Sequence, residues 1–88
     1  MDWMVRLSKE AAKQLEGLPS DRQELILKRL REMRENPFRG DVRALKGKKW
    51  QGRYRKVVGR YRLIFIPYYQ ERIVEISAIL SRAEKTYR

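Results

Sequence analysis

The Asn36-Pro37 pair separates two stretches of sequence in which the apolar residues repeat with different periods. Before it, apolar residues recur three or four positions apart, which is the spacing of one face of a helix. After it come three segments with strand character, at residues 53–58, 61–67 and 72–80. Because proline pushes the residue before it out of the helical region, a helix is expected to end here.

The N-terminal half predicts one strand followed by a helical hairpin. Residues 3–7 alternate apolar and other side chains, as a half-buried strand does. Ser8 is then expected to cap a first helix, whose apolar positions are Ala11, Leu15 and Leu18. Ser20 and Gln23 have the spacing of a capping box and predict the start of a second helix. The apolar stripe of that helix consists of Ile26, Leu30 and Met33.

The order of these elements predicts the fold class. The chain reads strand, helix, helix and three strands, with Gly59-Arg60 as a two-residue hairpin connection. We expect a single α+β domain over residues 1–88, with the helical hairpin packed on one face of a small, twisted, antiparallel-dominated sheet. Leu45 and Trp50 are expected to anchor the intervening loop in the core. In the last strand, a period of two places these residues on one face: Val74, Ile76, Ala78 and Leu80.

The charge of the chain is concentrated in its second part. The net charge is +11, and residues 37–88 contribute most of it, with fourteen Lys and Arg against four Asp and Glu. Crowded like charges destabilise a fold, so an excess of this kind indicates a polyanionic partner. The alternative is a basic surface that only keeps the protein soluble.

The residue types that are missing limit the chemistry. The sequence has no cysteine and no histidine, which excludes disulfides, thiolate metal sites and a cysteine nucleophile. We therefore expect no metal and no cofactor. The N-terminus does not resemble a signal peptide, and the longest apolar stretch, residues 63–67, is far too short to cross a membrane. A cytoplasmic location with no membrane partner is expected.

Arginines on the predicted strands are the strongest candidates for a binding site. Strand periodicity places Arg53 and Arg55 on one face, and Tyr54 and Lys56 on the other. Arg62 stands across the hairpin, and Arg82 and Tyr87 follow the last strand. Guanidinium groups bind phosphate through two coplanar hydrogen bonds, and an aromatic ring can stack on an unpaired base. This combination favours single-stranded or loop RNA, although basic residues on edge strands also serve only to prevent aggregation.

Four short patterns resemble the RelE/ParE superfamily of type II toxin–antitoxin toxins, and in particular its RelE-like branch. They are Leu45-Lys46-Gly47, Arg53-x-Arg55, Gly59-Arg60-Tyr61-Arg62, and Ser81-Arg82-Ala83-Glu84 with Tyr87. The layout with the helical hairpin first is also similar, so the resemblance covers nearly the whole chain. It implies a RelE-like fold and a ribosome-dependent mRNA endonuclease, or mRNA interferase. In such enzymes the 2′-hydroxyl of the message attacks the adjacent phosphate without a metal.

The resemblance also implies roles for individual residues. Arg62 would stabilise the pentacovalent phosphate, Arg82 would act near the leaving 5′-oxygen, and Tyr87 would stack on the scissile nucleotide. Arg53 and Arg55 stand where active members often have lysines, and since arginine keeps its proton, they would act as electrostatic stabilisers. The general base is open among Lys46, Lys48, Lys56, Glu84 or no protein group. The wider RNA-binding set is expected to be Lys46, Lys48, Lys49, Lys56 and Arg60.

Partners follow from the same resemblance. We expect a short acidic antitoxin with an amphipathic helix, together with the ribosome and mRNA. Two other functions remain open: a ParE-like poison of DNA gyrase, and a catalytically inactive module that binds RNA or the ribosome.

Overall fold

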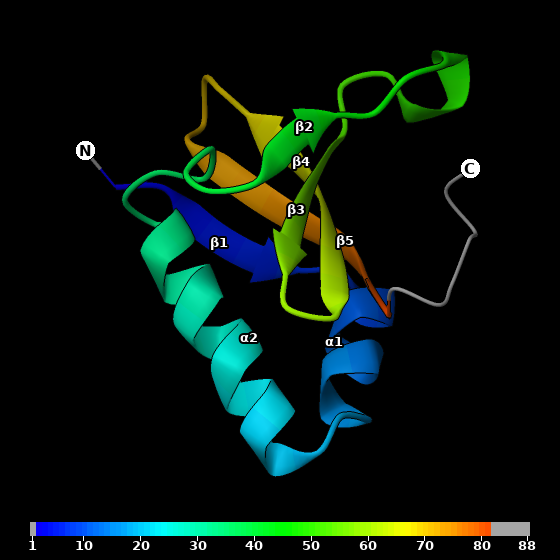
Figure 1. Ribbon diagram of the computed structural model, residues 1–88. Coiled ribbons are helices and arrows are strands. Elements are labelled where there is room, and N and C mark those ends of the chain that lie inside the picture. Colours follow the sequence, from blue (N-terminus) through cyan, green and yellow to red (C-terminus); the bar gives the residue numbers. More distant parts are fainter. Residues whose placement is uncertain (1, 82–88) are drawn as a thin grey trace.

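The computed structural model describes residues 2–81, which form two helices and one sheet of five strands (Figure 1). In chain order the elements are β1 (Met4–Leu7), α1 (Lys9–Glu16), α2 (Ser20–Met33), β2 (Val42–Ala44), the 3-10 helix η1 (Lys48–Trp50), β3 (Tyr54–Val58), β4 (Tyr61–Tyr68) and β5 (Ile73–Ser81). The strands lie side by side in the order β1-β5-β4-β3-β2. The predicted α+β class and the predicted order of helices and strands are confirmed.

The sheet is mixed. Strands β2, β3, β4 and β5 pair antiparallel, whereas β1 runs parallel to β5 at the edge of the sheet. Parallel strands cannot be joined by a hairpin, and here the helices and the other strands lie between the two in sequence. The three-residue strand β2 was not predicted, because Val42–Ala44 is too short to show a period. It extends the sheet beyond β3 by one strand.

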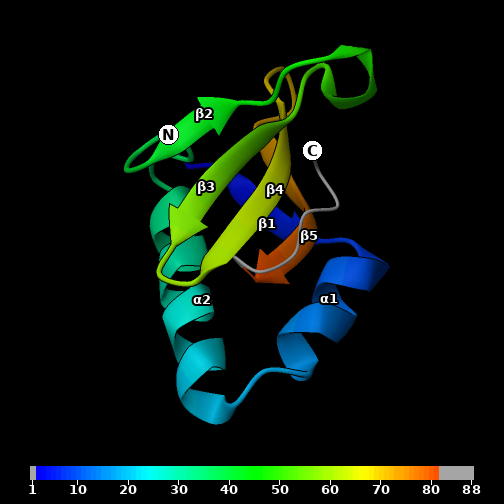
Figure 2. The same ribbon diagram turned by 45° about the vertical axis from the view of Figure 1, so that its right-hand side comes forward.

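Helix α2 covers one face of the sheet, and the core lies between them. The predicted stripe of Ile26, Leu30 and Met33 is buried there. It packs against side chains from the central strands, namely Val58, Leu63, Phe65, Val74, Ile76 and Ile79. Helix α1 adds Ala11 and Leu15 to the same cluster. Figures 1 and 2 show the two helices diverging from their short connecting turn.

Helix α1 is fixed to the part of β5 that β1 does not reach. Ser8 caps the helix as predicted, since its hydroxyl accepts a hydrogen bond from the Ala11 amide at 3.1 Å. The same hydroxyl donates to the Ser77 carbonyl at 3.0 Å. Gln14 Oε1 accepts a hydrogen bond from the Ile79 amide at 2.6 Å. A strand edge near the core needs partners for its amides, and α1 side chains supply them where β1 has ended.

The predicted capping box of α2 is wrong. Ser20 is already the first helical residue, and Pro19 stands at the capping position without any side-chain hydrogen bond. Proline is favourable at a helix start because its fixed φ suits the first turn. Gln23 instead donates to the Leu18 carbonyl at 2.8 Å, so it ties α2 to the turn from α1.

A register shift in β5 changes which residues face the core. Phe65 pairs with Ile76, and its neighbour Ile64 pairs with Ala78. Ser77 is therefore an extra residue in β5, opposite the junction between Ile64 and Phe65 in β4. The extra residue reverses the alternation that follows it. Val74 and Ile76 share one face as predicted, and this face meets the core, but Ile79 takes the next core position. Ala78 and Leu80, which were predicted to share a face with Val74 and Ile76, turn to the opposite side of the sheet.

Neither helix between residues 2 and 81 is long and apolar enough to cross a membrane.

Candidate nucleic-acid interface

The face of the sheet opposite α2 carries a row of arginines. Strand pairing aligns Arg43 with Arg55 and Ile64, and aligns Arg62 with Val57 and Leu80. Paired residues of neighbouring strands point to the same side, and Arg53 joins them by alternation along the chain. We call this side the open face and define it by seven residues: Arg43, Arg53, Arg55, Arg62, Ile64, Ala78 and Leu80. The core residues Leu63 and Phe65 alternate with it along β4.

A cleft of about 590 Å³ opens on this face. Its lining residues come from α1, η1 and strands β4 and β5, together with the residue before β3: Glu10, Lys49, Trp50, Arg53, Ile64, Ser77, Ala78 and Leu80. Apolar side chains from the sheet form one part of the lining and cationic side chains another. A cleft of this kind can bind a ligand that has both a flat apolar part and a negative charge.

The segment around η1 extends away from the core. Gly47 has a φ of +98°, which permits the turn before η1. The Leu45 amide donates to the Arg53 carbonyl at 2.9 Å, and the Arg53 amide donates to the Trp50 carbonyl at 3.0 Å, so the segment closes on itself. Figure 1 shows it projecting beyond the ends of β2 and β3.

The prediction that Leu45 and Trp50 anchor the core is therefore wrong. Both are half-buried and neither belongs to the core cluster or packs against it. Trp50 instead lines the cleft, with the Lys49 ammonium 5.5 Å from its ring centroid.

One nitrogen of the Arg55 guanidinium group lacks a hydrogen-bond partner. Its Nη1 atom is buried and has no hydrogen-bond partner within residues 2–81. It forms an ion pair with Asp41, whose Oδ1 atom lies 3.9 Å away, which is beyond hydrogen-bonding distance. A buried donor without a partner costs on the order of 1–3 kcal/mol. Arg55 therefore places a buried positive charge beneath the open face.

The structure brings most of the predicted arginines together. Arg53 lines the cleft and donates through Nη1 to the Lys49 carbonyl at 3.4 Å. Arg55 and Arg62 stand on β3 and β4 of the same face. Arg43 was missed by the sequence analysis because its short strand was not predicted. Arg82 and Tyr87 lie outside the described residues.

The predicted lysine set is dispersed. Lys49 lines the cleft, whereas Lys46 and Lys48 are exposed on the same segment without lining it. Arg60 is exposed in the β3–β4 turn, at the opposite end of the hairpin from η1 (Figure 1). Lys56 points to the α2 side of the sheet, where it is only 5% exposed and its Nζ donates to the Arg39 carbonyl at 2.7 Å. Lys56 is therefore separated from the open face by the sheet itself.

Burial gives Lys56 a distinct pH dependence. Loss of solvation lowers its pKa from the ordinary value of 10.5, with Glu32 opposing this effect and Arg29 and Arg39 adding to it. Folding at neutral pH must bury an ammonium group, and this cost disappears as the pH rises from the lowered pKa towards 10.5. We expect Lys56→Met to raise the free energy of unfolding most, relative to wild type, at neutral pH. This gain in free energy should shrink as the pH rises from the lowered pKa of Lys56 towards 10.5.

Urea unfolding of both proteins at pH 7, 9 and 10.5 measures this change. Lys28→Met, at an exposed position, serves as the control. Its free energy of unfolding should differ from that of wild type by the same amount at all three pH values. A difference for Lys56→Met that is equally constant would contradict the burial argument.

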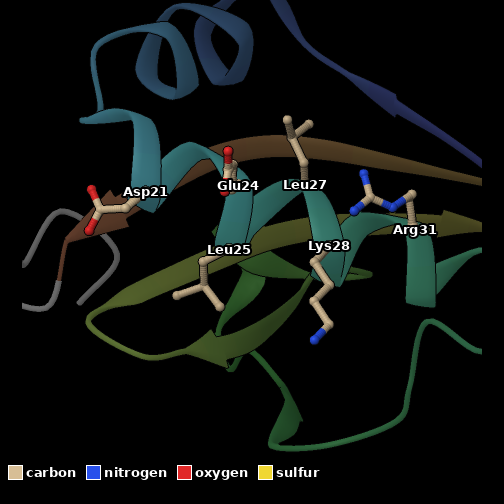
Figure 3. Close-up of a pocket in the computed structure, with 6 residues that line it drawn as sticks. All are labelled: Asp21, Glu24, Leu25, Leu27, Lys28 and Arg31. Carbon is tan, nitrogen blue, oxygen red and sulfur yellow. The ribbon is translucent and has the colours of Figure 1, made fainter.

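A second surface lies on α2, away from the open face. A pocket of about 540 Å³ is lined by Asp21, Glu24, Leu25, Leu27, Lys28 and Arg31, which Figure 3 shows along the helix. A smaller groove of about 240 Å³ lies between α2 and β1, with these lining residues: Val5, Leu7, Leu27, Leu30, Arg31 and Arg34. Leu27 borders both and is 39% exposed. We call these two depressions the α2 surface.

Comparisons with known proteins agree with this architecture. Residues 5–86 match the family model described as ParE toxin of type II toxin-antitoxin system, parDE. A search of the curated proteins found no significant match.

Solved structures with a similar fold come from several organisms. The archaeal RelE–RelB complex from Pyrococcus horikoshii OT3 is similar with a TM-score of 0.81 and 23% identity, over 97% of this chain and all of that chain. The toxin–antitoxin complex RelBE2 from Mycobacterium tuberculosis gives a TM-score of 0.84 and 20% identity, over 93% and 100%. The YoeB/ParE toxin from Agrobacterium tumefaciens gives 0.75 and 15%, over 89% and 96%. At these identities the likeness shows a shared fold.

Proposed function

The chain belongs to the ParE toxin family of type II toxin–antitoxin systems. From this we propose that it acts as an RNA endonuclease, which cuts messenger RNA on the ribosome with its open face. The observation that carries this proposal is the convergence of Arg43, Arg53, Arg55 and Arg62 on one side of the sheet, beside a cleft that contains Trp50. Phosphates would bind the guanidinium groups, and a base could stack on the indole ring.

The proposed reaction uses the message's own 2′-hydroxyl as nucleophile. The 2′-oxygen bonds to the adjacent phosphorus and loses its proton, while the bond from phosphorus to the 5′-oxygen breaks and that oxygen gains a proton. The products are a 2′,3′-cyclic phosphate and a 5′-hydroxyl end. Arg62 would stabilise the negative charge that develops on the phosphorane, with Arg53 and Arg55 adding to the positive field. Arg82 would stand near the leaving oxygen, and Tyr87 would orient the nucleotide.

Arginine is a poor proton acceptor because its pKa stays above about 12. Lys56 cannot take the 2′-proton either, since its Nζ lies on the α2 side and binds the Arg39 carbonyl. The arginines of the open face are therefore assigned to charge stabilisation in this proposal, and proton transfer is assigned to other groups or to solvent.

Mapping of message 5′ ends on translating ribosomes tests this function. Induction of the protein should produce cuts in phase with codons, and the Arg62→Ala, Arg82→Ala double variant should abolish them. A Lys13→Ala, Arg22→Ala double variant loses the same charge from the two helices and should still cut. Intact messages after induction of the wild-type protein would contradict the proposal.

Poisoning of DNA gyrase is the second candidate function, because the matching family model is that of a ParE toxin and the sequence resemblance extends to ParE-like gyrase poisons. It requires protein contact and no phosphate chemistry. In the same induced cells it would appear as stalled supercoiling and accumulating DNA breaks, with intact messages.

For the neutralising partner we propose an acidic, amphipathic antitoxin segment that binds the α2 surface. Support comes from the apolar groove between α2 and β1, whose rim carries Arg31 and Arg34. Amphipathic helices commonly bind such grooves through apolar side chains spaced three or four residues apart. In the solved complexes named above, RelE-type toxins are bound to their antitoxins.

A Leu27→Glu variant is expected to weaken antitoxin binding by at least tenfold, because a carboxylate would replace an apolar contact of the groove and would repel an acidic segment. Tyr68→Glu is the matched control, since Tyr68 is 38% exposed but stands on β4. Calorimetric titration with the product of the neighbouring reading frame measures both affinities. Equal affinities for the two variants would contradict the proposed docking surface.

A further inference from the structure

We propose that Glu10 and Trp50 form a binding site for a single guanine base, an inference that rests on the proposed action on RNA. Glu10 is the only acidic residue that lines the described part of the cleft, and the other charged lining residues are Lys49 and Arg53. A carboxylate repels phosphate, so its place in a cleft for a polyanion calls for a different kind of contact. Hydrogen-bond donors on a nucleobase provide one.

One hydrogen bond along α1 joins the exposed Glu10 side chain to Gln14. Its Oε2 accepts a hydrogen bond from Gln14 Nε2 at 3.4 Å, and Gln14 Oε1 is itself fixed by the Ile79 amide at 2.6 Å. None of the ion pairs formed within residues 2–81 includes Glu10, although two cations line the same cleft. The carboxylate therefore keeps most of its acceptor positions for a ligand.

Trp50 supplies the aromatic surface on which a base can stack. Its backbone is held in η1, where the Trp50 amide donates to the Gly47 carbonyl at 3.1 Å. The ring lines the cleft outside the core cluster, and Lys49 Nζ lies 5.5 Å from its centroid. Unpaired bases in RNA–protein complexes stack on such rings and are read along their Watson–Crick edges. Lys49 and Arg53 are then available for the phosphates on either side of the stacked base.

The donor pattern of the bases selects guanine. A carboxylate presents two acceptors side by side and no donor. Guanine presents the N1–H and the 2-amino group side by side on its Watson–Crick edge, which matches both oxygens. Adenine and cytosine each present one amino group next to a ring nitrogen acceptor, and uracil presents one N–H between two carbonyls. These neighbouring acceptors would repel the carboxylate.

Binding of short RNA probes tests this site independently of cleavage. The probes are labelled trinucleotides with 2′-O-methyl groups, which block attack, and the central base is guanine, inosine, adenine, cytosine or uracil. Fluorescence anisotropy with the full-length protein at low salt gives each affinity. Inosine lacks only the 2-amino group, so it should bind about tenfold more weakly than guanine, as expected for one lost hydrogen bond to a charged group.

Two variants and a control complete the test. Glu10→Gln should reduce the preference for guanine over inosine to less than about twofold, whereas Glu16→Gln, which removes a charge from α1 outside the cleft, should keep it. Trp50→Ala should weaken all probes at least tenfold. Binding without base preference, or a preference that survives Glu10→Gln, would overturn this inference and leave the proposed function standing. No binding of any probe by the wild-type protein would also overturn this inference, whereas the proposed function is overturned separately, by intact messages after induction.

Discussion

An Arg62→Ala protein is expected to cut ribosome-bound message about 10²–10³-fold more slowly than wild type, as for the loss of a donor that stabilises transition-state charge. Arg62 pairs across the sheet with Val57 and Leu80, so it stands on the open face, where its Nε and Nη1 atoms are buried. Its loss would remove positive charge where the phosphorane is proposed to form. Single-turnover cleavage of a programmed message measures the rate.

Arg62→Lys separates charge from geometry. Lysine keeps the charge but lacks the planar fork, so its rate should lie between those of wild type and Arg62→Ala. Arg22→Ala on α2 is the control for a general loss of charge. A cleavage rate for Arg62→Ala within about threefold of wild type, in a protein that unfolds at the wild-type temperature, would contradict the assigned role.

A Phe65→Ala replacement should cost about 3–5 kcal/mol of folding free energy, which is typical of a buried phenylalanine. Phe65 is fully buried, and its ring stacks on Tyr54 with centroids 5.6 Å apart and lies 6.0 Å from Phe38. It therefore joins β3, β4 and the segment after α2. Small domains have a free energy of unfolding of roughly 5–15 kcal/mol, so this variant should be close to unfolding at 37 °C.

Urea unfolding followed by circular dichroism measures the effect. Tyr68→Ala, an exposed aromatic position on the same strand, should change the free energy of unfolding by less than about 0.5 kcal/mol. If Phe65→Ala lost less than about 1 kcal/mol, the core would not depend on this ring in the way that its burial indicates.

Much of the fold could be predicted because its signals are local. The helical spacing of Ile26, Leu30 and Met33 and the break at Asn36-Pro37 depend only on nearby residues. The side of the sheet to which Ile79 points could not be predicted, because it depends on Ser77 being an extra residue in the pairing of β5 with β4. Strand β2 exists through its hydrogen bonds with β3 and has little signal of its own. The position of Trp50 follows from a loop that extends past the sheet, although tryptophan is usually buried.

The candidate site was predicted to the extent that strand alternation determines it. Alternation was sufficient to place Arg53 and Arg55 together and to place Lys56 on the other face with Tyr54. The burial of Lys56 against the Arg39 carbonyl could be seen only in the tertiary structure, as could the approach of Glu10 from α1 to the cleft. Arg43 could be identified only once β2 was paired with β3.

Cleavage of a defined message by purified components tests the proposed function most directly. The purified protein is added to ribosomes that hold a single message with a codon in the A site, and the message is analysed for breaks and for the chemistry of its new ends. We expect one cut in the A-site codon that leaves a 5′-hydroxyl end, and none when the nucleotide before the cut is 2′-deoxy. A message that stays intact, while the same protein inhibits purified DNA gyrase, would show that the open face does not cut RNA.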